Sequence, residues 1–189
     1  MIKTVIDEKT LQKRIKELAK KIENDYKNED ITVICILKGS IYFFADLTKR
    51  IKNNLSIEFM RVSSYGSGTE STGEIQLKLD LNTSIENKNV IVVEDIIDSG
   101  RTLSYLIKYL KIKKPKTLKL CTLLDKPDRR IVKDVYVDYV GFTIPDYFVV
   151  GYGLDLDEKY RNIPCIKCFV KDKDEYAKLL ESKKKITSK

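Results

Sequence analysis

The most constraining feature of this sequence is a buried strand that leads through an acidic turn directly into a helix. Residues 90–93 are all apolar, which is typical of a strand covered on both faces. Glu94 and Asp95 follow the strand, and the pattern of apolar side chains predicts a helix over residues 102–110. Ligands of open parallel sheets bind at the carboxyl ends of the strands, so this turn is a candidate binding site.

The same alternation of strands and helices continues along the chain. Residues 31–37 form a second continuous apolar run, and apolar side chains recur at helical spacing over residues 7–26. Further strands are predicted at 57–63, 75–81, 117–124, 136–142 and 148–152, and further helices at 40–51 and 172–181. Buried strands joined by helices predict an α/β fold with a mainly parallel sheet.

The length and one irregular segment complete the predicted organisation. A chain of 189 residues is expected to form a single domain over residues 1–189, because domains usually contain roughly 100–200 residues. Residues 63–74 hold three glycines among many Ser and Thr residues, and such a segment cannot build a core. It is predicted to be a mobile loop.

The absence of histidine limits the chemistry that the chain can perform. It excludes every mechanism that needs an imidazole base or a histidine metal ligand. Acid–base chemistry then falls to Asp, Glu, Lys, Tyr or Cys. Cys35 and Cys121 lie in apolar runs, and Cys165 and Cys168 form a lone Cys-x-x-Cys without the second pair that a zinc site needs. We therefore expect no metal or redox role for the cysteines.

The net charge of +8 raises the question of a nucleic-acid partner. The excess lies in predicted helices and in the tail at residues 183–189, where solvated faces explain it. No basic stripe interleaved with aromatic residues appears, so we expect neither nucleic-acid binding nor a membrane partner. The N-terminus shows no signal peptide and no apolar run approaches the ~20 residues of a membrane span, so a reducing cytoplasm is the expected compartment.

The turn after residues 90–93 combines two kinds of ligand chemistry. Adjacent carboxylates such as Glu94 and Asp95 can hold sugar hydroxyls or a hydrated Mg²⁺ ion. The turn continues as Asp98-Ser99-Gly100-Arg101-Thr102, where free backbone N–H groups and two hydroxyls can cradle a phosphate. The combination matches a ribose 5-phosphate. The glycine-rich signatures of mononucleotide and dinucleotide binding are absent from the sequence.

These residues closely resemble the phosphoribosyl-pyrophosphate motif of type I phosphoribosyltransferases. Four apolar residues, the acid pair and the Asp-Ser-Gly-Arg-Thr segment match it over residues 90–102. The resemblance implies a parallel core sheet flanked by helices, with a small hood. It also implies Mg²⁺-dependent transfer of phosphoribose from phosphoribosyl pyrophosphate to a base.

Further segments resemble the hypoxanthine (hypoxanthine-guanine) phosphoribosyltransferases in their short bacterial form, over nearly the whole chain. Lys38, Gly39 and Ser40 follow the strand at 31–37 and match the pyrophosphate loop of that family, which is entered through a cis peptide that is not at proline. The sequence alone leaves open whether Leu37–Lys38 is cis. Ser64 and Tyr65 match the lid that closes over the reaction centre. A lid would exclude water, which would otherwise hydrolyse a cation-like sugar intermediate.

The base site is implied by the resemblance at the C-terminal half of the chain. Lys126 would donate to the exocyclic oxygen at C6 of the purine, and Phe148 would stack on the ring. Val149 would present backbone groups to the edge of the base. Asp155 matches an aspartate of the purine site that is associated with the Mg²⁺ on the pyrophosphate side, and Arg161 matches a pyrophosphate-contacting arginine.

The predicted activity is therefore transfer of 5-phosphoribose to N9 of hypoxanthine or guanine, which gives IMP or GMP and pyrophosphate. Glu94 and Asp95, with Asp155, are the predicted Mg²⁺ ligands. The predicted phosphoribosyl-pyrophosphate contacts are Lys38, Gly39, Ser40, Glu94, Asp95, Asp98, Ser99, Gly100, Arg101, Thr102 and Arg161. Asp98 is the predicted catalytic base, or it stabilises the protonated purine.

Three alternatives remain open on the sequence alone. The base could instead be guanine, xanthine or a broad range, and Arg101 and Tyr147 depart from residues often found in relatives. A nucleotide-sensing regulator is a second alternative, although the chain has no spare helix-turn-helix. A plain nucleic-acid binder is the third. The family resemblance also implies a homo-oligomer, either a dimer or a tetramer.

Overall fold

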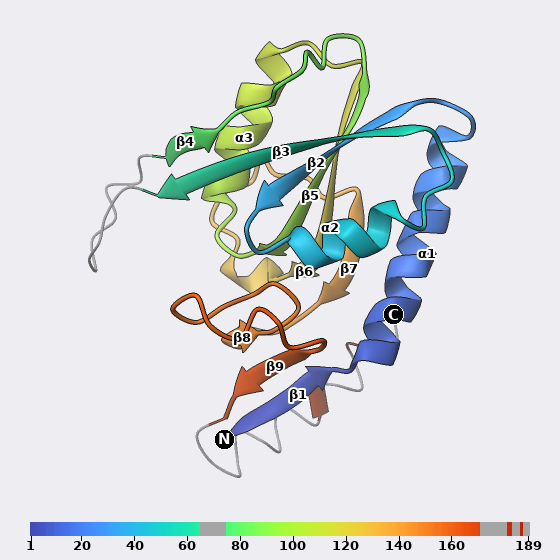
Figure 1. The fold of residues 1–189 in the computed structure, drawn as a ribbon. Coiled ribbons are helices and arrows are strands. Elements are labelled where there is room, and N and C mark those ends of the chain that lie inside the picture. Colours follow the sequence, from blue (N-terminus) through green and yellow to red (C-terminus); the bar gives the residue numbers. More distant parts are fainter. Residues whose placement is uncertain (65–74, 171–180, 183–185, 187–189) are drawn as a thin grey trace.

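The computed structural model describes residues 1–64, 75–170, 181, 182 and 186 (Figure 1). Within these ranges, a six-stranded sheet has the order β4-β3-β2-β5-β6-β7. Its strands are β2 (Ile31–Leu37), β3 (Leu55–Ser64), β4 (Ile75–Leu79), β5 (Asn89–Ile97), β6 (Thr117–Asp125) and β7 (Tyr139–Thr143). All neighbours are parallel except β3 and β4. The predicted α/β fold with a mainly parallel sheet is confirmed.

Helices cover both faces of this sheet, which explains why its central strands are apolar without alternation. Val33 and Cys35 of β2 pack into one core cluster with α1 (Glu8–Tyr26) and α2 (Ile41–Thr48). Ile34 and Ile36 of the same strand face the opposite way, into a cluster with α3 (Arg101–Ile112). No helix in the described ranges is long and apolar enough to cross a membrane.

Helix α1 begins at a capping aspartate, which supports a first stability prediction. Asp7 Oδ1 accepts a hydrogen bond from the backbone N of Thr10 at 2.9 Å, and Oδ2 accepts from Thr10 Oγ1 at 3.0 Å. We expect Asp7→Ala to lower the free energy of unfolding by about 1 kcal/mol, because a backbone donor loses its partner. Urea denaturation followed by circular dichroism measures this, with the exposed Lys9→Ala as the control. Equal stability of the two variants would contradict the capping role.

A small antiparallel sheet forms the hood that the family resemblance implied (Figure 1). Its order is β1-β9-β8, with β1 (Ile2–Ile6), β8 (Val149–Val150) and β9 (Ile166–Phe169). The sequence prediction missed β1 and β9 and made β8 too long. The lone Cys-x-x-Cys lies at β9, where Cys168 is buried and Cys165 is partly exposed.

Two other predicted boundaries need correction. Strand β5 continues through Glu94 and Asp95, so the acid pair belongs to the strand rather than to the turn after it. The loop predicted at 63–74 begins later, because Ser63 and Ser64 pair with β4. Tyr65 and the rest of that segment lie outside the described residues, as does most of the helix predicted at 172–181.

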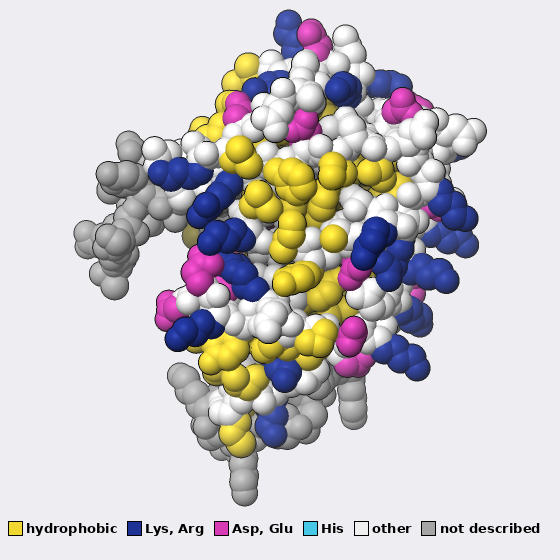
Figure 2. All heavy atoms as spheres, viewed as in Figure 1, with side chains coloured by type: hydrophobic (Ala, Val, Ile, Leu, Met, Phe, Trp, Pro, Cys, Tyr) yellow, Lys and Arg dark blue, Asp and Glu magenta, His cyan; other side chains and the backbone are white. Residues whose placement is uncertain are grey.

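One face of the molecule shows how charged and apolar side chains are distributed (Figure 2). Lys and Arg side chains lie toward its two sides, with acidic side chains among them, and apolar side chains gather over β3 and beside α2. The exposed apolar residues of these two elements include Ile57, Ile41 and Tyr42. The positive charge on this face therefore does not form a single stripe.

Candidate active site

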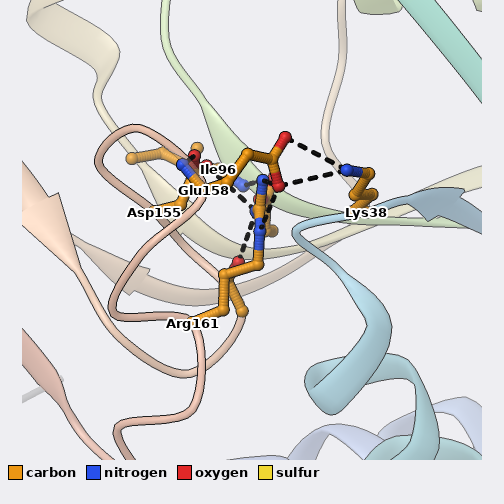
Figure 3. Close-up of polar contacts among 7 residues, drawn as sticks. Lys38, Ile96, Asp155, Glu158 and Arg161 are labelled. Atoms are coloured by element: carbon orange, nitrogen blue, oxygen red, sulfur yellow. Dashed lines mark hydrogen bonds and ion pairs between the residues drawn. The ribbon is translucent and has the colours of Figure 1, made fainter.

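The candidate site lies at the carboxyl ends of three adjacent parallel strands. Lys38 follows β2, the acid pair lies near the end of β5, and Lys126 follows β6. Because β2, β5 and β6 run side by side, their ends meet at one edge of the sheet. The segment between β8 and β9 approaches the same edge and adds Asp155 and Arg161 (Figure 3).

The turn after β2 fits tightly against the acid pair. The Leu37–Lys38 peptide is cis, as the family resemblance implied. A Cβ added to Gly39 would lie 1.5 Å from Asp95 Oδ2, and one added to Gly153 would lie 1.8 Å from the carbonyl oxygen of Gly39. Three segments far apart in the sequence therefore interlock through two glycines. Only glycine leaves room for these approaches.

Ser40 has a structural partner that the sequence did not reveal. Its side chain is fully buried, and Oγ donates to the carbonyl oxygen of Ile36 at 2.6 Å. Cys35 Sγ lies 3.1 Å from the same hydroxyl. The hydroxyl thus holds the turn together, and a contact of Ser40 with phosphoribosyl pyrophosphate stays a prediction.

The acid pair is only partly compensated within the described residues, where Arg161 supplies positive charge near Asp95. Glu94 Oε2 is buried without a hydrogen-bond partner there, and Asp95 Oδ1 accepts from the backbone N of Ile96 at 2.8 Å. Burial, followed by the charge of Asp95, raises the pKa of Glu94 well above its usual value. Burial also raises the pKa of Asp95. Such a pair favours a bound cation or hydroxyl donors.

The carboxylate oxygens of this site suit a cation that is coordinated partly by the protein and partly by a bound ligand. No three acidic or cysteine side chains gather into a metal site in the described ranges, so Asp155 does not join Glu94 and Asp95 in one cluster. Mg²⁺ usually binds to one or two carboxylates and completes its shell with water and substrate oxygens. The orphaned oxygen of Glu94 beside Asp95 is therefore a suitable anchor for Mg²⁺, while Asp155 stands apart.

The phosphate cradle predicted at the start of α3 has the backbone that it requires. Gly100 is the N-cap of α3 with φ +81°, a conformation that glycine adopts without strain. Gly100 provides no side-chain cap, and the backbone N of Arg101 makes only a long contact of 3.5 Å with Ser99 Oγ, so the N–H groups at this helix end can bind an anion. Ser99, Arg101 and Thr102 border this end, and Arg101 is exposed.

The base side contains a buried lysine between two aspartates. Lys126 is 6% exposed, and its Nζ lies 3.4 Å from Asp146 Oδ1 and 3.8 Å from Asp98 Oδ2. Arg129, in the 3₁₀ turn η1 (Pro127–Arg129), bridges the same two aspartates at 2.5 Å and 2.9 Å. Sequence reasoning missed Arg129 and Asp146, whose only signal was their closeness to Lys126 and Phe148.

The predicted aromatic platform is exposed. The Phe148 side chain is 56% exposed, and its ring centroid lies 6.2 Å from that of Phe169. Val149 is buried at the start of β8. An exposed aromatic ring offers a face on which a planar ligand can stack.

The segment between β8 and β9 carries its own network of charges (Figure 3). Arg161 Nη1 lies 2.9 Å from Asp155 Oδ1 and donates to the carbonyl oxygen of Gly153 at 2.7 Å. Glu158, which sequence reasoning also missed, accepts from Lys38 and from Arg161. Those two bonds, with Lys38 first, lower the pKa of Glu158.

Comparison with known proteins identifies this arrangement. A family model described as a phosphoribosyl transferase domain matches residues 2–157. The hypoxanthine-guanine phosphoribosyltransferase of Bacillus subtilis is 48% identical over 164 residues, which cover 87% of this chain and 91% of that protein. The chain belongs to the hypoxanthine-guanine phosphoribosyltransferase family. The predicted family, fold class and enzyme class, a purine salvage phosphoribosyltransferase, are thereby confirmed.

Solved structures of the family agree with this. A hypoxanthine-guanine phosphoribosyltransferase from Bacillus anthracis, with a HEPES molecule in its active site, has a TM-score of 0.85 at 56% identity, covering 90% of this chain and 100% of that one. A hypoxanthine phosphoribosyltransferase from Staphylococcus aureus has a TM-score of 0.85 at 48% identity, covering 89% and 91%. The bifunctional TilS/HprT protein of Listeria monocytogenes is 51% identical over 164 residues, but this chain spans only 25% of its length.

Proposed function

We propose that the chain transfers 5-phosphoribose from phosphoribosyl pyrophosphate to N9 of hypoxanthine, and also of guanine, releasing IMP or GMP and pyrophosphate. One observation carries the proposal most strongly. The acid pair with its orphaned Glu94 oxygen, the start of α3 and the buried Lys126 all lie at one edge of the sheet. They supply partners for a sugar, a phosphate and an oxopurine in that order.

The ribose and its 5-phosphate are held by β5 and the turn after it. Glu94 and Asp95 accept hydrogen bonds from the two ribose hydroxyls, which restores partners to buried acceptor oxygens. The N–H groups that follow Gly100 bind the phosphate together with the hydroxyls of Ser99 and Thr102. This orientation exposes C1 of the ribose toward the base.

The leaving pyrophosphate lies between two turns. Lys38 and Arg161 supply positive charge from opposite sides, and the backbone around Gly39 approaches closely because no side chain intervenes. These cations stabilise negative charge that grows on the leaving group, which is commonly the largest contribution to catalysis. Mg²⁺, when bound, would be held by Glu94 and Asp95 and would neutralise charge on the pyrophosphate. Asp155, which stands apart from that pair, would act toward a Mg²⁺ ion on the pyrophosphate side.

The purine is bound by residues after β5, β6 and β7 and at the start of β8. Lys126 donates to O6 of the base, Phe148 stacks on its face, and backbone groups of Val149 contact its edge. Asp98 lies 3.8 Å from Lys126, so its carboxylate is placed next to the base that Lys126 binds, where it accepts a proton from the purine or stabilises its protonated form. Ser64 and Tyr65 contribute to a lid that excludes water.

The proposed reaction is tested by supplying one base at a time. The protein is incubated with Mg²⁺ and phosphoribosyl pyrophosphate, with hypoxanthine, guanine or xanthine added separately, and nucleotide and pyrophosphate are quantified. We expect IMP and GMP to form, and the xanthine arm measures the breadth of the base site. Absence of product with every base would overturn the proposal.

Removal of the metal should abolish the reaction. We expect excess EDTA to stop nucleotide formation, because the charge on pyrophosphate and the like charges of Glu94 and Asp95 are then uncompensated. Added Mg²⁺ should restore the rate, which a continuous assay of nucleotide absorbance follows. Full activity in EDTA would contradict a role for a divalent cation.

Lys126 should control use of the base rather than of the sugar donor. We expect Lys126→Met to lower kcat/KM for hypoxanthine by roughly 10- to 100-fold, because a charged donor to the base is lost. The KM for phosphoribosyl pyrophosphate should change little. Steady-state kinetics with varied base measure this, and Lys133→Met, an exposed lysine of the same connection, is the control. Equal losses for both substrates would argue against the assigned role.

Assembly and location follow the family resemblance as part of the proposal. We infer that residues 1–189 form one catalytic domain that acts in the cytoplasm as a dimer or tetramer. The exposed Ile41, Tyr42 and Ile57 provide apolar surface of the kind found at subunit interfaces. Sedimentation velocity tests this, and a monomer at micromolar concentration would contradict it.

A further inference from the structure

A carboxylate of the chain itself occupies the place between the two cations assigned to pyrophosphate. Both side-chain oxygens of Glu158 lie 3.1 Å from Lys38 Nζ. Glu158 Oε2 also lies 3.0 Å from Arg161 Nη2 and accepts from Arg161 Nε at 3.4 Å. Figure 3 shows the Glu158 side chain reaching across from the segment between β8 and β9 to the turn after β2.

The backbone presents this carboxylate in an unusual way. Leu156 and Lys159 pair through two backbone hydrogen bonds of 3.2 Å and 3.0 Å, which leaves Asp157 and Glu158 at the tip of a two-residue turn. Both tip residues have positive φ, +50° and +63°. Such turns favour Asn and Gly, and a glutamate there is strained. Strain of this kind is retained mainly at functional sites, so the turn itself points to a role for Glu158.

A backbone hydrogen bond fixes the position of Glu158. The backbone N of Glu158 donates to Asp155 Oδ2 at 2.9 Å, and the other oxygen of Asp155 pairs with Arg161. The segment between β8 and β9 thus carries both the anionic Glu158 and the cationic Arg161, linked through Asp155. Lys38 comes from a different element, 120 residues away in the sequence.

The contact is arranged so that a ligand can displace it. The side chains of Lys38 and Glu158 are 45% and 63% exposed, and exposed ion pairs contribute little to stability. A carboxylate carries one negative charge, whereas pyrophosphate carries several and offers more acceptor oxygens. Pyrophosphate therefore displaces Glu158 from the two cations when it is bound, and Glu158 pairs with them when pyrophosphate is absent.

We propose that Glu158 is an internal counter-anion that competes with pyrophosphate for Lys38 and Arg161. It withdraws when phosphoribosyl pyrophosphate binds and returns to the two cations as pyrophosphate leaves. The exchange lowers the affinity for the leaving group and so favours its release. This inference rests on the proposed function, because it assumes that Lys38 and Arg161 bind pyrophosphate.

The test is product inhibition of the Glu158→Gln variant, which keeps the shape of the side chain and removes its charge. We expect the inhibition constant of pyrophosphate to fall by about three- to tenfold, since competition from the carboxylate is lost. The inhibition constant of IMP, measured without pyrophosphate, should change less than about twofold. A general structural effect would shift both constants.

A matched control is available in the same turn. Asp157 is exposed, has positive φ and forms no ion pair with any described residue, so Asp157→Asn removes the same charge without removing the contact. We expect Asp157→Asn to leave pyrophosphate inhibition unchanged. Glu158→Ala, which also removes the hydrogen-bonding group, should tighten pyrophosphate as Glu158→Gln does.

The outcomes separate this inference from the proposed reaction. A wild-type protein that forms no nucleotide with any base refutes both. An active wild type whose pyrophosphate inhibition is unchanged in Glu158→Gln and Glu158→Ala overturns the counter-anion and leaves the reaction standing. An equal change in Asp157→Asn also overturns it, because net charge would then explain the effect.

Discussion

Asp98→Asn is expected to lower kcat by about 100-fold or more, while the KM for phosphoribosyl pyrophosphate stays within about twofold. Asp98 follows directly after β5, and its carboxylate faces Lys126 at 3.8 Å and Arg129 at 2.5 Å. An amide has nearly the same shape but cannot accept a proton from the purine. Initial rates with saturating hypoxanthine and varied donor measure the two effects separately.

The neighbouring aspartate supplies the matched control. Asp146 contacts the same two cations, yet the mechanism assigns it no proton transfer. Asp146→Asn should therefore lower kcat by less than about tenfold, because it changes only the positions of Lys126 and Arg129. Near-normal turnover of Asp98→Asn, or equal losses in the two variants, would contradict the role of Asp98.

Gly39→Ala is expected to lower kcat/KM for phosphoribosyl pyrophosphate by about 100-fold or more. The new methyl group would lie 1.5 Å from Asp95 Oδ2, so either the turn after β2 or the carboxylate must shift. Both the turn and the carboxylate belong to the proposed binding site for phosphoribosyl pyrophosphate. A displacement by about 1 Å is enough to lower the rate about 100-fold. Steady-state kinetics at saturating hypoxanthine provide the measurement.

A substitution at a second glycine serves as a control that separates effects on catalysis from effects on stability. Gly141 lies in β7, where an added Cβ would approach the carbonyl oxygen of Leu123 to 2.4 Å, within the sheet. Gly141→Ala should lower the melting temperature more than Gly39→Ala does and affect kcat/KM less. Wild-type kinetics in Gly39→Ala would show that the interlocking of Gly39 with Asp95 does not matter for binding.

Much of the core fold was predictable because its strands are buried on both faces. Continuous apolar runs such as residues 31–37 identified the central strands, and helical spacing identified α1. The hood was harder to predict. β1 and β9 are short and half-exposed, and they pair across nearly the whole chain, with Ile2 opposite Phe169. A single local pattern does not reveal such a pairing.

The residues of the candidate site likewise fall into a group that the sequence predicted and a group that it did not. The acid pair, Asp98 and Gly100 could be proposed as site residues from the sequence because they lie in one contiguous segment. Arg129 and Glu158 were missed because their meaning depends on partners brought close only by folding. Arg129 reaches Asp98 from 31 residues away, and Glu158 reaches Lys38 from 120 residues away. Exposed charged residues in short turns look like ordinary surface until those partners are placed.

The central claim is tested most directly by the stoichiometry of products from hypoxanthine, phosphoribosyl pyrophosphate and Mg²⁺. We predict that the wild-type protein forms one IMP and one pyrophosphate for each hypoxanthine consumed, and that Asp98→Asn forms them about 100-fold more slowly. Circular dichroism establishes that both proteins are folded. A folded wild-type protein that releases pyrophosphate without IMP, or that forms neither product, would contradict the account.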